Sequence, residues 1–195
     1  NTWTEYTWAE SRELVDRLAA GLLARGLARE QRVGIISSTR LEWILLDLAV
    51  ACAAGATTTV YPNTAAGDVE FILGDSGTCI AVVEDAAQLA KVEASPILKE
   101  TIHTIIVIDA ANVVDASNVE LSDRIISYTQ LQLRGAELLK QNPKAVDETV
   151  ASTDRDTLST LIYTSGTTGQ PKGVRLNHAS WIYEGSGTKH WEIID

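Results

Sequence analysis

The chain has 195 residues, enough for one domain or for a domain and part of a second. Hydrophobic residues make up 45% of it, so it can bury a sizeable core, which excludes wholesale disorder. Its formal net charge of −10 argues against phosphate contacts along a nucleic acid, and we expect no nucleic-acid partner. The longest apolar stretch, Trp43 to Ala56, contains Asp47 and is too short to cross a bilayer. We therefore expect no transmembrane segment and, at most, peripheral membrane contact.

The first part of the chain alternates between helical and strand-like patterns. Thr7 and Glu10 form a capping box, and leucines follow at helical spacing until Gly26. The further expected elements are a strand over 32–37, a helix over 41–54, a strand over 57–61, a helix capped by Thr64, a strand over 79–83, a helix around 86–92, a strand over 104–108 and a helix that starts at a capping box of Ser127 and Gln130. This order predicts an α/β fold with a mostly parallel sheet and helices on both faces.

Polar connections over 109–122 and 142–156 divide the pattern. The second leads into a new apolar run, so we expect a first α/β subdomain over 1–157 and the start of a second, truncated one over 158–195. Cys52 and Cys79 lie among small or apolar neighbours, which is typical of reduced core residues in a cytosolic protein; a single disulfide is the alternative. Five acidic side chains in the first part of the chain are interpreted as solvated charges: Asp68, Glu70, Asp75, Glu84 and Asp85.

Residues 159–174 hold the strongest functional signal. An apolar, β-prone run leads into glycines, which let the backbone approach a ligand and turn several N–H groups toward one anion. Hydroxyl residues add donors, and a lysine adds a mobile point charge. The common P-loop needs a glycine before the lysine and a hydroxyl residue after it, whereas Pro171 and Gly173 stand there. We expect an ATP phosphate-binding site formed by Thr164, Ser165, Gly166, Thr167, Thr168, Gly169 and Lys172. The alternative is a polar hairpin connection without a ligand.

Residues 164–173, Thr-Ser-Gly-Thr-Thr-Gly-Gln-Pro-Lys-Gly, resemble the AMP-binding signature of the adenylate-forming superfamily. That superfamily includes acyl-CoA synthetases, luciferases and the adenylation domains of peptide synthetases. The resemblance implies that the loop holds the β- and γ-phosphates of ATP while a carboxylate attacks the α-phosphorus. Three further segments are similar to the front end of bacterial long-chain fatty acyl-CoA synthetases: Arg40–Trp43, Val60–Thr64 and Ser180–Gly185.

The same resemblance implies the substrates and further site residues. The substrates would be a fatty acid, ATP with Mg²⁺, and coenzyme A, and Thr164 would also lie close to the metal. The superfamily often has a histidine in the position of His178, near the nucleotide or acyl path. A structural histidine at the start of a helix is the alternative for His178.

Family members are longer, and their later motifs for adenine, ribose and the catalytic lysine of the lid do not occur here. We therefore expect the N-terminal fragment of an ATP-dependent long-chain fatty acid–CoA ligase, with no catalytic residue of its own and no activity alone. Its expected location is the cytoplasm, with the inner membrane face as a site of peripheral contact. A fatty acyl-AMP ligase, a peptide-synthetase adenylation domain and a non-catalytic α/β interaction module are the alternatives.

Overall fold

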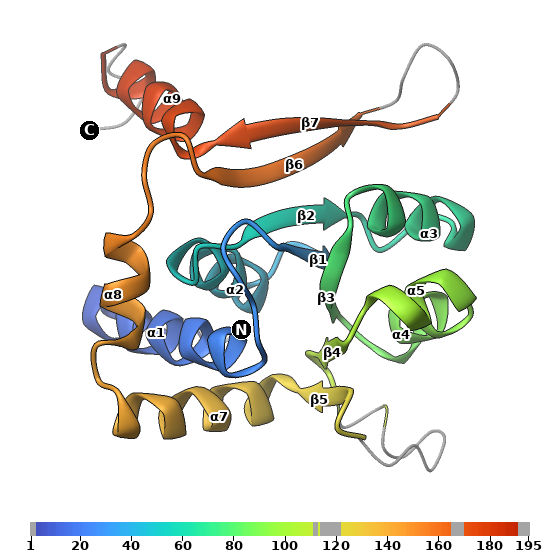
Figure 1. Ribbon diagram of the computed structural model, residues 1–195, viewed down its shortest axis with the longest axis horizontal. Helices are drawn as coiled ribbons and strands as arrows, with labels where there is room; N and C mark the ends of the chain where they lie inside the picture. Colours follow the sequence, from blue (N-terminus) through green and yellow to red (C-terminus); the bar gives the residue numbers. More distant parts are fainter. Residues whose placement is uncertain (1–2, 111–112, 114–121, 165–169, 191–195) are drawn as a thin grey trace.

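The computed structural model describes residues 3–110, 113, 122–164 and 170–190 (Figure 1). Within them, the strands form a seven-stranded sheet in the order β5-β4-β3-β1-β2-β6-β7. The strands are β1 Arg32–Ile36, β2 Ala56–Val60, β3 Thr78–Val83, β4 Thr104–Val107, β5 Ile125–Ser127, β6 Leu158–Thr164 and β7 Lys172–Asn177. The helices are α1 Trp8–Ala24, α2 Leu41–Cys52, α3 Ala66–Asp75, α4 Ala86–Glu93, α5 Pro96–Thr101, α7 Tyr128–Gln141, α8 Ala145–Ala151 and α9 His178–His190.

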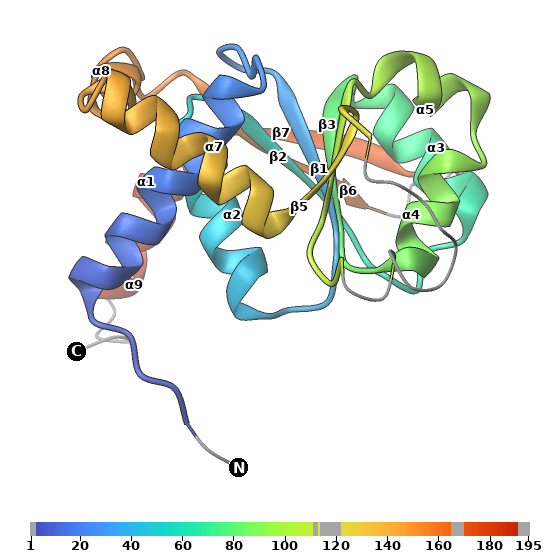
Figure 2. The same ribbon diagram turned by 90° about the horizontal axis from the view of Figure 1, so that it is seen from below.

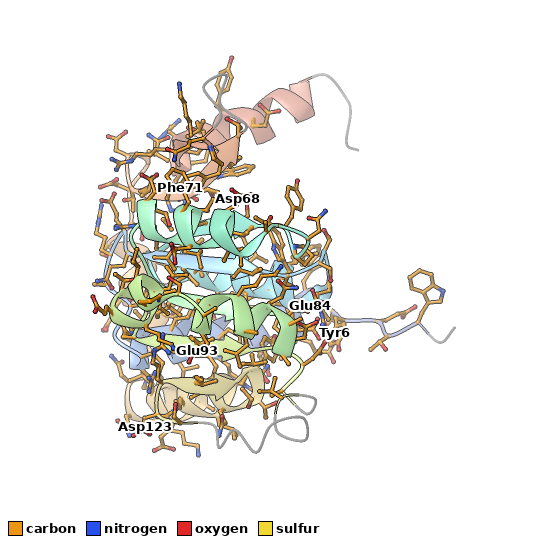
Figure 3. The ribbon with its side chains drawn as sticks, turned by 90° about the vertical axis from the view of Figure 1, so that its right-hand side faces the viewer. Tyr6, Asp68, Phe71, Glu84, Glu93 and Asp123 are labelled. Atoms are coloured by element: carbon orange, nitrogen blue, oxygen red, sulfur yellow. The ribbon has the colours of Figure 1, made fainter. Side chains whose placement is uncertain are left out.

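The predicted sheet and its two helical layers are confirmed. Every strand pairing is parallel except that of β6 with β7, which is antiparallel. Figure 2 shows α1, α2, α7 and α8 on one face of the sheet and α3, α4 and α5 on the other. Figure 3 shows the second layer face on, with Asp68 and Phe71 on α3 and Glu93 at the end of α4.

The central strands are buried on both faces, which explains their continuous apolar sequence. In β3, Ile80 and Val82 contact the core under α1 and α2, whereas Ala81 and Val83 contact the core under α3, α4 and α5. Because successive side chains of a strand point to opposite faces, one apolar run serves both cores.

Helix starts follow the predicted caps in two places. The Thr7 backbone N–H donates to the Glu10 carboxylate at 2.8 Å, and Ser127 makes the same reciprocal box with Gln130. The cap predicted at Thr64 is wrong: α3 begins after Ala65, which has no side-chain cap hydrogen bond. The 142–156 connection was also expected to lack secondary structure, but α8 occupies part of it.

Residues after 157 extend the same sheet. Strand β6 lies beside β2, with Thr160 opposite Thr57 and Leu161 opposite Thr58. The entry to β6 is held by the first part of the chain, because Glu30 accepts a hydrogen bond from the Leu158 N–H at 2.8 Å and Arg29 donates to the Thr157 hydroxyl at 2.7 Å. The division of the chain at residues 157 and 158 stays a prediction.

Candidate functional site

The predicted phosphate loop joins the two strands of the β6–β7 hairpin. Thr164 ends β6 and Lys172 begins β7, and the two residues lie directly opposite each other. Both are exposed. Ser165, Gly166, Thr167, Thr168 and Gly169 lie outside the described residues. Thr164 and Lys172 therefore place a hydroxyl and an ammonium group at the two ends of the loop.

This end of the hairpin lies at the carboxyl edge of the sheet. Strands β1, β2 and β6 run parallel, so the loops that follow them emerge at the same edge. In open α/β sheets, ligands bind outside the carboxyl ends of the strands. The position of Thr164 and Lys172 thus suits a ligand site, and the exposed cation of Lys172 suits an anion.

Tyr163 anchors this end of the hairpin to α3. Its hydroxyl donates a hydrogen bond of 2.6 Å to Oδ2 of Asp75, the last residue of α3. Its ring covers Gly173, the cross-strand partner, where an added Cβ would lie 2.9 Å from Cζ of the ring. Burial, followed by the hydrogen bond to Asp75, raises the pKa of the Tyr163 hydroxyl, which keeps it a donor.

The interpretation of the acidic residues as solvated charges is wrong for three of them. Asp75 accepts from Tyr163, and Asp85 caps α4 by accepting from the Gln88 N–H at 3.0 Å. Glu84, labelled in Figure 3, accepts from the Ser38 N–H at 2.6 Å and from the Ser38 hydroxyl at 2.8 Å. Asp75 and Tyr163 are 88 residues apart, so no local pattern pointed to their contact.

Glu84 follows β3, next to β1, where the strand order reverses. The connections after β1 and β3 leave the sheet toward opposite faces, which makes this the usual ligand position in open sheets. Here the Glu84 carboxylate binds the loop after β1, and Arg40 adds an ion pair with Asp109 at 2.8 Å and one with Glu84 at 3.6 Å. The backbone hydrogen bond from Ser38 is the main cause that lowers the pKa of Glu84.

A cleft of about 390 Å³ lies on the other side of β1. Its lining combines hydroxyl groups with aromatic and aliphatic side chains from α2, β2, β6, α9 and the loops after β1 and β2: Ser37, Ser38, Thr39, Trp43, Asp47, Thr59, Val60, Tyr61, Pro62, Thr160, Ile162 and Trp181. The Trp181 indole N–H donates to the Thr160 hydroxyl at 3.1 Å. Burial raises the pKa of Asp47, although a hydrogen bond from Thr57 opposes this. The cleft offers apolar contact and neutral donors.

His178 lies at the other end of the hairpin. It starts α9, as predicted, and its backbone N–H donates to the Thr157 carbonyl at 3.1 Å. Because β7 separates it from Lys172, the two lie about 20 Å apart at about 3.3 Å per residue. Its Nε2 is buried and has no hydrogen-bond partner among the described residues. His178 lines a cavity of about 420 Å³ with Cys52 and Arg155. The structure therefore does not bring it together with Thr164 and Lys172.

Cys52 and Cys79 are free and half-buried, and burial raises the pKa of both thiols. The described part of the chain holds no group of three or more His, Cys, Asp or Glu side chains that could bind a metal ion. It also holds no helix that is long and apolar enough to cross a membrane. The proximity of Thr164 to Mg²⁺ stays a prediction.

Comparison with known proteins identifies the class. The family described as AMP-binding enzyme matches residues 1–194, so the chain belongs to this family. Long-chain-fatty-acid–CoA ligase FadD15 of Mycobacterium bovis is 30% identical over 191 residues, which cover 96% of this chain and 29% of that protein. Long-chain-fatty-acid–CoA ligase heimdall of Drosophila melanogaster is 28% identical over 183 residues, or 93% of this chain and 26% of that protein.

Solved structures agree on the fold. The anthranilate CoA ligase AuaEII, in complex with anthranoyl-AMP, superposes with a TM-score of 0.71 at 19% identity, over 90% of this chain and 30% of that one. A Mycobacterium tuberculosis fatty acyl CoA synthetase gives a TM-score of 0.65 at 25% identity, over 92% of this chain and 32% of that one. The fold is that of the N-terminal part of adenylate-forming enzymes, and the chain spans less than a third of the length of these relatives.

Proposed function

We propose that the chain is the N-terminal part of an ATP-dependent long-chain fatty acid–CoA ligase. The observation that carries the proposal is the position of Thr164 and Lys172, which face each other at the carboxyl edge of the sheet, at the two ends of the signature loop. Two relatives that match nearly the whole chain are named long-chain-fatty-acid–CoA ligases, which supports the choice of substrates.

The proposed reaction has two steps. A carboxylate oxygen of the fatty acid bonds to the α-phosphorus of ATP, while the bond from that phosphorus to the bridging oxygen breaks and pyrophosphate leaves. The thiol of coenzyme A then loses its proton and attacks the acyl carbonyl, and AMP leaves. In the first step the protein has to hold the phosphates in line and stabilise the charge that develops on pyrophosphate.

Residues of this chain would serve that first step. Lys172, as an exposed point charge, would bind the β- and γ-phosphates, and the hydroxyl of Thr164 would donate to them. Ser165, Gly166, Thr167, Thr168 and Gly169 are proposed to complete the loop. Mg²⁺ bound with ATP would neutralise phosphate charge, and the Thr164 hydroxyl is the group proposed to lie near it. A place of His178 near the nucleotide or acyl path stays a prediction, and a structural role at the start of α9 is the alternative.

The groups that bind adenine and ribose and the catalytic lysine would come from residues outside this chain. Adenine, ribose and the catalytic lysine of the lid have no matching motif in the sequence. The 195 residues alone are therefore expected to be inactive. We place the complete ligase in the cytoplasm, with peripheral contact at the inner membrane face where a long-chain fatty acid is available.

The test uses the complete protein that contains this chain, with a long-chain fatty acid, ATP, Mg²⁺ and coenzyme A. The expected products are acyl-CoA, AMP and pyrophosphate. Acyl-AMP that never passes to coenzyme A would identify a fatty acyl-AMP ligase instead. Pyrophosphate exchange that depends on an amino acid would identify a peptide-synthetase adenylation domain. No nucleotide binding by the complete protein would leave a non-catalytic interaction module.

A further inference from the structure

We propose that Tyr163 is a positioning residue, which sets the place of Lys172 by joining the end of the β6–β7 hairpin to α3. The proposal rests on the proposed function, because it assigns to Lys172 the role of binding phosphates. It concerns the side chains of Tyr163 and Asp75 and the backbone of Gly173, all of which the structure describes.

The end of the hairpin needs such an anchor. The register of β6 with β2 covers Thr160 and Leu161, and the rest of β6 continues beyond it with β7 as its partner. In β7, the four consecutive residues from Lys172 to Arg175 are exposed. A two-stranded ribbon is marginally stable by itself in water. Without a further contact, bending of the β6–β7 hairpin would change the position of Lys172.

Tyr163 supplies that contact in two directions. Toward β7, its ring packs over Gly173, the residue next to Lys172, where an added Cβ would meet Cζ at 2.9 Å and the hydroxyl oxygen at 3.1 Å. Toward the body of the protein, it packs against the core under α3 and donates to Asp75. The glycine after the signature lysine is therefore needed for a close approach of the ring.

The hydrogen bond from the Tyr163 hydroxyl to the Asp75 carboxylate is a strong one. A hydroxyl that donates to a carboxylate makes a charge-assisted bond, which is shorter and stronger than a neutral one. The distance of 2.6 Å agrees. Asp75 ends α3, whose Val69, Ile72 and Leu73 are buried, so the acceptor belongs to a packed element. The line of contacts thus runs from a rigid helix through Tyr163 and Gly173 to Lys172.

The experiment is a double-mutant cycle in the complete ligase, read by fatty-acid-dependent exchange of pyrophosphate into ATP. Tyr163→Phe keeps the ring over Gly173 and removes the hydroxyl. We expect kcat to fall about tenfold to 100-fold, the order of loss for a reacting group displaced by about 1 Å. The KM for the fatty acid should stay within about twofold of wild type. Tyr163→Phe combined with Lys172→Ala should be no slower than Lys172→Ala alone, because the hydroxyl acts through the lysine.

Three other outcomes would contradict the positioning role of Tyr163, the proposed function, or both. If Lys172→Ala is slow but Tyr163→Phe matches wild type, the positioning role is wrong and the proposed function stands. If the two losses multiply in the double variant, Tyr163 acts independently of Lys172, and the inference is again wrong. If Lys172→Ala itself matches wild type, the proposed function fails and the inference fails with it.

Two further variants complete the experiment: one replaces Tyr163→Phe if that variant does not fold, and the other is a control. Asp75→Asn keeps Tyr163 in place and weakens the same bond, so it should reproduce the kcat loss if Tyr163→Phe does not fold. Tyr128→Phe is the matched control, since Tyr128 is also a half-buried tyrosine but lies at the start of α7, near the opposite edge of the sheet. Its kcat should stay within about twofold of wild type. A similar loss in Tyr128→Phe would mean that any removed tyrosine hydroxyl slows the enzyme, which contradicts the inference.

Discussion

Glu84 illustrates how much one side chain decides at the residue scale. Its carboxylate accepts from the Ser38 N–H and from the Ser38 and Ser37 hydroxyls, so it ties the loop after β1 to the end of β3. The carboxylate lies beside the position where open sheets usually bind ligands, and its hydrogen bonds go to the protein itself. Among the described residues, the cleft on the other side of β1 and the end of the β6–β7 hairpin lie at the same edge.

The substitution Glu84→Gln tests how much these hydrogen bonds of Glu84 stabilise the fold, because their contribution depends on pH. The folded-state pKa of Glu84 is lowered, so its contribution to stability is present above the unfolded pKa of about 4.3 and is lost as pH falls through the folded value. We expect the substitution to reduce the free energy of unfolding by about 1 kcal/mol at neutral pH. The difference between wild type and variant should shrink below about pH 4.

Urea unfolding of the chain at neutral and acid pH measures this difference. Glu5→Gln is the control, because Glu5 is exposed in the segment before α1. A difference for Glu84→Gln that stays constant as the pH falls would show that the carboxylate charge has no part in the tie.

At the element scale, the contact between α1 and α7 determines how the first helical layer packs. The two helices pack side by side (Figure 2), and they approach each other at Gly21 and Gly135. A Cβ added at Gly135 would lie 1.7 Å from the Arg17 carbonyl oxygen and 2.7 Å from the Gly21 nitrogen. A Cβ added at Gly21 would lie 2.4 Å from the Leu131 carbonyl oxygen. Because these neighbours are backbone atoms, the helices themselves would have to move apart.

Gly135→Ala is therefore expected to destabilise the chain by about 3 kcal/mol, at the upper end for overpacking. Gly67→Ala in α3 is the matched control, since nothing lies within 4 Å of its added Cβ. There the better helix propensity of alanine should be neutral or should stabilise by up to about 1 kcal/mol. Thermal unfolding of both variants gives the comparison, and equal stabilities would contradict the close crossing.

The elements that sequence predicted are those with a local signal. Apolar runs gave β1, β3 and β4, and the Thr7–Glu10 and Ser127–Gln130 boxes gave the starts of α1 and α7. Helix α8 was missed because it is only seven residues long and begins after Lys144, which makes no side-chain cap hydrogen bond. The cap at Thr64 was wrong because hydroxyl residues before a helix also serve in turns, and the Thr64 N–H donates to the Tyr61 carbonyl.

The candidate site could be predicted only in part. The residues of the loop follow from composition and resemblance, since glycine, hydroxyl and lysine chemistry is local. The anchor of Tyr163 on Asp75 depends on a contact between residues 88 positions apart, which no spacing rule supplies. The distance between His178 and Lys172 follows from the length of β7, which the pattern of residues alone did not give.

At the scale of the whole molecule, the proposed function gives this chain only part of a nucleotide site. The hairpin end would supply groups for phosphates, while the motifs for adenine and ribose are absent from the sequence. Fixing a loop of glycine, serine and threonine costs about 1–2 kcal/mol per residue, which few contacts are left to offset.

The 195-residue chain alone should therefore bind Mg·ATP with a dissociation constant near 1 mM, or about −4 kcal/mol, and make no acyl-CoA. Titration calorimetry on the purified chain measures the affinity, with Lys172→Ala as the comparison. A micromolar constant, or acyl-CoA formed from fatty acid, ATP and coenzyme A, would mean that the site is complete within these residues.

Lys172 is proposed to bind the phosphates of ATP in an adenylate-forming ligase. The most direct measurement is fatty-acid-dependent exchange of pyrophosphate into ATP by the complete ligase, its Lys172→Ala variant and an Arg175→Ala control, which removes an exposed cation from the same strand. Loss of one well-placed charged donor should slow exchange by about 100- to 1000-fold in Lys172→Ala, and Arg175→Ala should stay close to wild type. Exchange by Lys172→Ala within about threefold of wild type would contradict the phosphate role.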